Sequence, residues 1–173
     1  RPYMASSFIN FKDNGFWARD GFVESFQLLL FEEIQLQYQD ELQWLNDYKK
    51  DLALQSLPLI YGGMSMCLDE TLTDDSQTAI ILKLLDDIRK KIAIDKSYLT
   101  GEHLNLLRKT VRHFLVGIKE FEWDEKEIEK QLKDGGYGEL PFEKYKRGFD
   151  LLRTLVAGQL NIKVDTEITY WGE

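Results

Sequence analysis

Residues 16–38 of the chain read FWARDGFVESFQLLLFEEIQLQY, and this stretch decides the fold class. Its apolar side chains recur at the i, i+3, i+4 and i+7 positions that share one face of a helix: Phe22, Val23, Phe26, Leu29, Leu30 and Ile34. The pattern predicts a long amphipathic helix over 16–38. Such a helix buries its apolar face against other elements, so the segments around it determine the architecture.

The same helical period continues through most of the remaining chain. It predicts further helices over 40–56, 59–68, 76–93, 100–121, 124–133 and from 142 onward. Capping residues precede two of them, the cluster 73–76 and Thr100. Only Ile162–Trp171 alternates like a strand, and it has no second strand to pair with. We therefore expect an all-α fold, a single compact bundle of six or seven helices.

The domain organisation follows from the length and from these patterns. A chain of 173 residues with 43% hydrophobic residues is of a size for one domain with a sizeable core. We expect an N-terminal arm over 1–15, a helical bundle over 16–160 and an extended C-terminal tail over 161–173. The single cysteine, Cys67, excludes an internal disulfide and a multi-cysteine zinc site. Neither a membrane span nor a leader peptide is recognisable, so we expect a cytoplasmic protein.

The net charge of −8 is distributed unevenly along the chain. Between Asp20 and Leu82 there are twelve acidic residues and two basic ones, whereas the rest of the chain carries a small positive excess. An acidic surface repels nucleic acid and anionic membranes, and it attracts basic proteins. The charge pattern therefore predicts neither a nucleic-acid nor a membrane partner, and it favours a basic protein.

The sequence offers little that points to catalysis. His103 and His113 are the only histidines, and their directions on one helix differ by about 80°. The glycine clusters lack the spacing of a phosphate-binding loop. We expect no cofactor, no metal and no catalytic residues. An enzyme whose site is assembled from scattered residues remains an alternative, and its residues would be Glu33, Arg108, Arg112 and His113.

The first helix carries two acidic positions of particular interest. Glu33 falls within the apolar face, so it needs a partner, which Arg108 or Arg112 could provide. On the polar face, Phe31 shares a strip with Glu24. An aromatic side chain flanked by carboxylates is typical of an interface anchor with an acidic rim, although a further helix could equally cover Phe31.

Two segments resemble a known family. The opening NGFWARDGF at 14–22, which runs directly into the long helix, and the block GGMSMCLDE at 62–70 are similar to segments of small bacterial immunity proteins. These are encoded beside polymorphic toxins, including those of contact-dependent growth inhibition. The resemblance implies a cytoplasmic protein that binds the C-terminal domain of a cognate toxin, often a basic nuclease, and neutralises it.

We therefore expect an immunity protein with an acidic partner-binding surface. Its candidate contact residues are Glu24, Phe31, Glu32, Asp40, Asp47, Asp69, Glu70, Asp74 and Asp75. Two alternative functions remain. One is a helical adaptor or regulator that binds another protein, and the other is the enzyme whose site is assembled from scattered residues. We leave open whether the C-terminal tail over 161–173 pairs as a strand with a partner protein.

Overall fold

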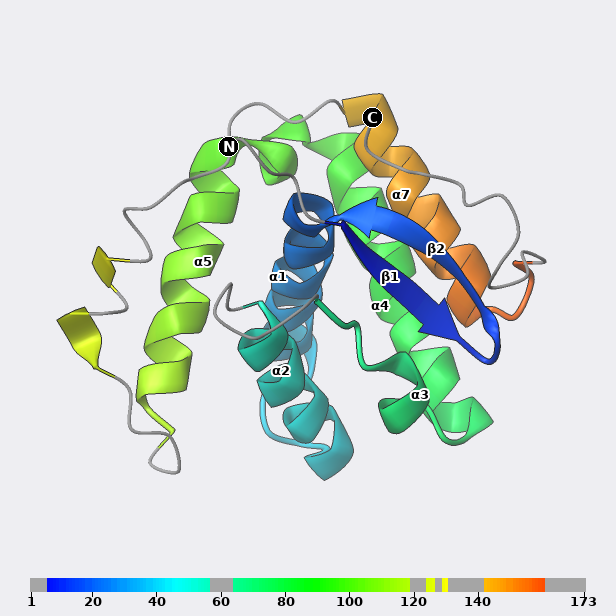
Figure 1. Ribbon diagram of the computed structural model, residues 1–173, viewed down its shortest axis with the longest axis horizontal. Helices are drawn as coiled ribbons and strands as arrows, with labels where there is room; N and C mark the ends of the chain where they lie inside the picture. Colours follow the sequence, from blue (N-terminus) through cyan, green and yellow to red (C-terminus); the bar gives the residue numbers. More distant parts are fainter. Residues whose placement is uncertain (1–5, 57–63, 119–123, 127–128, 131–141, 161–173) are drawn as a thin grey trace.

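The computed structural model describes residues 6–56, 64–118, 124–126, 129–130 and 142–160 (Figure 1). Within these residues the chain is mostly helical, as predicted. The elements in chain order are β1 (Ser6–Phe11), β2 (Asn14–Arg19), α1 (Asp20–Gln37), α2 (Gln43–Gln55), α3 (Leu68–Thr71), α4 (Asp75–Ile94), the 3₁₀ turn η1 (Lys96–Leu99), α5 (Gly101–Val116) and α7 (Phe142–Val156).

The prediction of an all-α fold is wrong at the start of the chain, where β1 and β2 form an antiparallel hairpin. The helix expected from residue 16 begins at Asp20 instead, because residues 14–19 pair with residues 6–11. The stretch expected as an N-terminal arm thus contains β1. Alternate side chains of the hairpin, including Ile9 and Phe16, are fully buried against the helices.

The hairpin turns through a two-residue loop, Lys12–Asp13, since Phe11 pairs with Asn14. Both loop residues have positive φ, 48° and 66°, as a tight turn between twisted strands requires. Asp69 of α3 accepts hydrogen bonds from the backbone N–H of Lys12 at 2.9 Å and from the side-chain amide of Asn10 at 3.1 Å. The loop is therefore tied to a segment more than fifty residues further along the chain.

Helix α1 lies at the centre of the molecule (Figure 1). Every residue of α1 from Phe22 to Phe31 is buried, because α2, α4 and α5 all pack on it and the hairpin covers its first turns. The run Leu28-Leu29-Leu30-Phe31 covers a full helical turn, so it can be buried only in a helix enclosed on every side.

The outer helices bury the faces that their periodicity predicts. In α4 the buried positions are Ile81, Leu84, Leu85, Ile88 and Ile92. Asp74 caps α4 by accepting the N–H of Gln77, and Thr100 caps α5 by accepting the N–H of His103.

Helix α7 packs on α4 through two ion pairs at its polar margin. The pairs Arg89–Asp150 and Arg153–Asp86 each have an N–O distance of 2.6 Å. The apolar side of α7 contributes Tyr145 and Phe149, whose rings pack against Phe26 of α1.

Three other predicted elements are described only partly or not at all. Of the helix expected over 59–68, residues 57–63 lie outside the described residues, and Met64–Cys67 has no regular structure before α3. The segment 124–133 is helical at 125–126 and 129–130, and its end lies outside the described residues, as does the tail Ile162–Trp171. Among the helices in the described part of the chain, none is both long and apolar enough to cross a membrane.

Candidate protein-binding surface

Glu24, predicted as a contact residue, is buried. Its Oε1 lies 2.9 Å from Nε of Arg108 and 3.8 Å from Nη2 of Arg112, both of which belong to α5. Arg112 is itself completely buried and donates to the hydroxyl and the carbonyl oxygen of Ser56, each at 2.9 Å. Glu24 therefore joins α1 to α5 inside the molecule and does not belong to an exposed surface.

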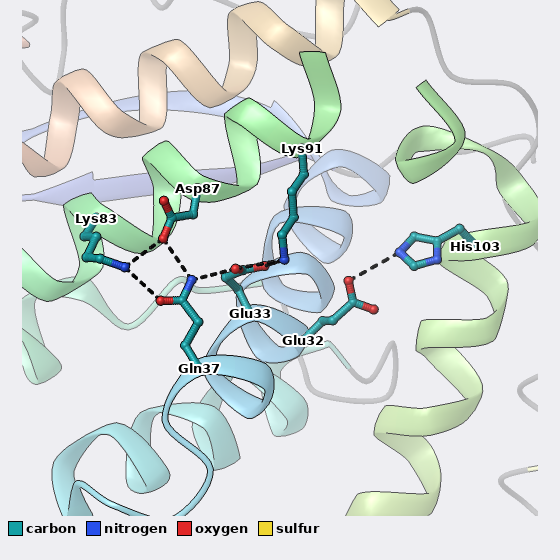
Figure 2. Close-up of polar contacts among 7 residues, drawn as sticks. All are labelled: Glu32, Glu33, Gln37, Lys83, Asp87, Lys91 and His103. Carbon is teal, nitrogen blue, oxygen red and sulfur yellow. Dashed lines mark hydrogen bonds and ion pairs between the residues drawn. The ribbon is translucent and has the colours of Figure 1, made fainter. Parts of the chain in front are cut away.

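Glu33 is buried as predicted, but neither expected arginine is its partner. Its carboxylate lies on the α4 side of α1 and forms an ion pair with Lys91 at 2.7 Å (Figure 2). Gln37 donates to Glu33 at 2.6 Å and to Asp87 at 2.9 Å, which extends the network to Lys83. Burial lowers the pKa of Lys91, but the hydrogen bond and charge of Glu33 outweigh it and raise the pKa overall.

Phe31 is also buried. The sequence left open whether it is an exposed interface anchor or a residue covered by a further helix, and the structure shows the second. Its ring lies edge-on to that of Phe114 of α5, with centroids 5.0 Å apart. Nζ of the buried Lys49 lies 5.2 Å from the centre of the Phe114 ring and 2.7 Å from Oε1 of Gln35. Phe31 is a core residue covered by another helix, and it cannot serve as an exposed anchor.

Glu32 and Asp40 differ in exposure. Glu32 is half-buried, and its Oε1 lies 3.5 Å from Nε2 of His103 (Figure 2). Asp40 is 88% exposed and lies 3.8 Å from Nζ of Lys49. Glu32 thus contacts a histidine and Asp40 a lysine, and an ion pair as exposed as that of Asp40 contributes little to stability.

The remaining candidates come together from two separate stretches of sequence. The hydroxyl of Tyr48 in α2 donates to the carbonyl of Met66 at 2.9 Å, and Gln55 of α2 accepts the N–H of Ser65 at 3.2 Å. These bonds hold the segment that leads into α3 against α2. As a result, Asp51 of α2 lies close enough to Glu70 of α3 for their charges to interact.

The electrostatics of Asp51 reflect this arrangement. Burial raises the pKa of Asp51, and the carboxylates of Asp47, one helical turn away, and of Glu70, on α3, raise it further. Lys50 opposes this shift without cancelling it. Burial is the largest cause of the raised pKa, and the like charges of Asp47 and Glu70 add to it because they favour the protonated form.

We call the acids of α2, of α3 and of the start of α4 the acidic surface, and they are the half-buried Asp51 and the exposed Asp47, Asp69, Glu70, Asp74 and Asp75. Two of the six also have structural roles, because Asp69 holds the hairpin loop and Asp74 caps α4. Asp51 was not among the predicted contact residues. Its i, i+4 spacing from Asp47 on one face of the helix is the signal that could have identified it.

The residues of the alternative enzyme site are not brought to one place. Glu33 pairs with Lys91 on α4, whereas Arg108 and Arg112 pair with Glu24, and His113 is exposed. Among the described residues, no group of histidine, cysteine and acidic side chains could hold a metal ion. Burial raises the pKa of Cys67, which keeps that thiol protonated at neutral pH.

The hairpin contributes a feature that the helical prediction missed. Phe8 and Trp17 face each other across the strands on the side away from the core, with ring centroids 5.3 Å apart. Two short runs rich in aromatic residues, 8–11 and 16–18, lie on either side of Asp13-Asn14-Gly15, and this is the hairpin signal that could have been followed.

Comparison of the chain with protein-family models, with curated proteins and with solved structures finds no match.

Proposed function

We propose that this chain is a cytoplasmic immunity protein that binds a basic toxin domain and neutralises it without catalysis. The observation that supports this most is the convergence of two acidic stretches. The hydrogen bond from Tyr48 to Met66 holds Asp47 and Asp51 of α2 beside Glu70 of α3. Helices α2 and α3 contain only two basic residues, Lys49 and Lys50, and the first of these is buried.

Such a concentration of one charge is costly for stability, which favours a role in binding. Placing the carboxylates of Asp47 and Glu70 where they raise the pKa of Asp51 destabilises the folded chain. Solubility alone requires acids spread over the surface rather than gathered in one region. A basic partner offsets the repulsion, because its lysine and arginine side chains neutralise the cluster on association.

The mechanism is occlusion of the toxin. A single-sign surface steers an oppositely charged protein and accelerates its association by a factor of about 10–10³ at low salt. Once bound, the acidic surface occupies the cationic groups with which a nuclease would hold phosphate, so nucleic acid is excluded from the toxin.

The test uses the C-terminal toxin domain that, by the family resemblance, should be encoded next to this chain. We would co-express the two in bacteria and measure growth, and then measure association by surface plasmon resonance at several salt concentrations. The acidic-surface variant carries Asp47→Asn, Asp51→Asn, Glu70→Gln and Asp75→Asn, which spare the two acids with structural roles. The control variant removes the same charge elsewhere through Glu102→Gln, Asp124→Asn, Glu125→Gln and Glu143→Gln, all of them exposed.

We expect the wild type and the control variant to rescue growth and to bind with a rate that falls steeply with salt. The acidic-surface variant should associate at least about 10-fold more slowly at low salt. Equal rates for the two variants would exclude the acidic surface as the contact. Binding without rescue of growth would instead support the adaptor, and the absence of both would overturn the immunity role.

A further inference from the structure

Residues 64–71, which we call the strap, run from an irregular stretch into helix α3 (Figure 1). Side chains of other elements hold the backbone of the irregular stretch. Ser7 of β1 accepts a hydrogen bond from the N–H of Met64 at 2.7 Å. Gln27 of α1 donates to the carbonyl oxygen of Ser65 at 2.8 Å. With the bonds from α2, these contacts fix the strap to three elements at once.

The far end of the strap positions the hairpin loop and part of the acidic surface. Asp69 accepts the backbone N–H of Lys12 at 2.9 Å. Glu70, the next residue, is close enough to Asp51 of α2 for their charges to interact. Helix α3 has only four residues, too few for a helix to be stable without contacts to the rest of the protein. The positions of Asp69 and Glu70 therefore depend on the side chains that hold the strap.

The bonds that hold the strap allow it to open without unfolding its neighbours. Each of them has a side chain as one partner, so breaking it leaves the backbone hydrogen bonds of the helices and the hairpin intact. Cys67, at the start of α3, has a φ of 51°, a left-handed conformation that is unfavourable for residues other than glycine and asparagine. Opening relieves this strain, whereas the burial of Met66 and Leu68 opposes it and keeps the open state rare. We therefore expect the strap to open more readily than the helices around it.

Gln27 is the contact that can be removed with the least effect elsewhere. Its side chain is completely buried, and among the residues that the structure describes its Oε1 has no hydrogen-bond partner. A buried amide oxygen without a partner is unfavourable, so this side chain contributes to stability mainly through its bond to Ser65. An apolar side chain of similar length at this position removes one bond to the strap and no other hydrogen bond.

We propose that the strap opens as one unit, and that its opening releases the hairpin loop and separates Glu70 from Asp51. The acidic surface is then complete only while the strap is closed. A basic domain that contacts the acids of α2 and of α3 together stabilises the closed state. This link to binding rests on the proposed function, whereas the opening is a property of the free protein.

Native-state hydrogen exchange, followed by NMR at single amides, tests the opening in the free protein. The reporters are the amides of Met64, Ser65 and Lys12, because each is bonded across the boundary of the strap. In the wild type we expect one common opening constant for the three, at least about 10-fold larger than that of Leu84, which is completely buried in α4. Opening constants equal to that of Leu84 would overturn the proposal.

Two matched substitutions on α1 separate the opening of the strap from global unfolding. Gln27→Met should raise the opening constant of the three reporters about 10-fold, because only the closed strap uses this side chain. Gln37→Met removes hydrogen bonds to Glu33 and Asp87, which lie outside the strap, so it should raise the opening constant of Leu84 and leave the reporters unchanged. Parallel increases at the reporters and at Leu84 in Gln37→Met would mean that the strap opens only with the whole protein, which overturns the proposal. If Gln27→Met does not fold, the wild type and Gln37→Met decide.

The complex with the toxin domain tests the link to the acidic surface. A partner that binds only the closed state slows exchange through opening by about 100-fold when its free concentration is about 100 times its dissociation constant. We expect this slowing at Lys12 and Met64 alike. A complex that forms and leaves their exchange unchanged would overturn the link but not the opening. If the wild type binds no toxin domain, the proposed function fails and the link fails with it, while exchange in the free protein still decides whether the strap opens.

Discussion

The hydroxyl of Tyr48 lies 2.9 Å from the carbonyl oxygen of Met66, and this buried hydrogen bond joins α2 to the segment that precedes α3. The tyrosine is fully buried, so its hydroxyl has to be satisfied within the protein. The same bond sets the position of α3 relative to α2, and with it the spacing of Asp51 and Glu70. A single core contact thus supports both the stability of this region and its surface charge.

Tyr48→Phe tests the energetic value of that bond. The substitution keeps the ring but leaves the Met66 carbonyl unsatisfied, so we expect a loss of about 1–2 kcal/mol in the free energy of unfolding, measured by urea denaturation. Burial raises the pKa of Tyr48 above its ordinary value of 10.0. The wild type should therefore lose stability as pH rises above about 10, where the unfolded tyrosine ionises first, and the variant should lose less. Parallel alkaline profiles would contradict the burial of this hydroxyl.

Asp51→Asn should stabilise the protein at neutral pH. Its pKa is raised by burial and by neighbouring carboxylates, so the ionised side chain opposes folding at pH values above the folded-state pKa. Removing a like-charge i, i+4 pair with Asp47 should yield about 0.2–0.5 kcal/mol. The gain should vanish below the ordinary pKa of 3.8, where the carboxyl is protonated in both states. Thermal unfolding at pH 3 and pH 7 measures both effects, and an equal change in stability at the two pH values would contradict the prediction.

Lys91→Met and Lys83→Met compare a buried ion pair with an exposed one on the same helix. Lys91 neutralises Glu33, a carboxylate that is only 2% exposed, so its removal should cost about 3 kcal/mol. Lys83 pairs with Asp87 at 2.9 Å on the surface of α4, and its removal should cost far less than that of Lys91, because exposed ion pairs contribute little to stability. Equal losses in chemical denaturation would mean that Glu33 is exposed to water in solution.

Gly15→Ala and Gly21→Ala should change stability in opposite directions. A Cβ at Gly15 meets a backbone oxygen at 2.4 Å, which a strand cannot accommodate without shifting, so we expect a loss of about 1–3 kcal/mol. A Cβ at Gly21 meets nothing within 4 Å in the first turn of α1, so alanine should leave stability unchanged or raise it by up to about 1 kcal/mol. Differential scanning calorimetry distinguishes the two, and a neutral Gly15→Ala would argue against the packing of Phe8 on the strand.

The register of the hairpin illustrates where local sequence is insufficient. Asn14-Gly15 is itself a favoured two-residue turn, and a turn there would pair Asp13 with Phe16. That register and the observed one both place Ile9, Phe11, Phe16 and Ala18 on the same face, because they differ by an even number of residues. The alternating pattern cannot choose between them. The contacts of Asp69 with Asn10 and Lys12 favour the observed loop, and they come from a distant part of the chain.

The two buried acids of α1 show the same limit in the helical part. Periodicity correctly placed Glu33 in the apolar face and predicted that it needs a charged partner. It did not reveal whether α4 or α5 packs on that face, so it proposed arginines that pair with Glu24 instead. Which acids are buried depends on how many sides of a helix are covered, and α1 is covered on all of them.

The sequence by itself determined the helical character of most of the chain, the buried faces of α4, α5 and α7, and the concentration of acids in its N-terminal half, because these depend on spacing along one element. The tertiary structure alone decided that Glu24 and Phe31 are interior, that Asp51 lies close enough to Glu70 for their charges to interact, and that Phe8 faces Trp17 across the hairpin. Such relations require knowing which elements pack together, and packing is set by long-range contacts such as Tyr48–Met66 and Asp69–Lys12, which no local pattern encodes.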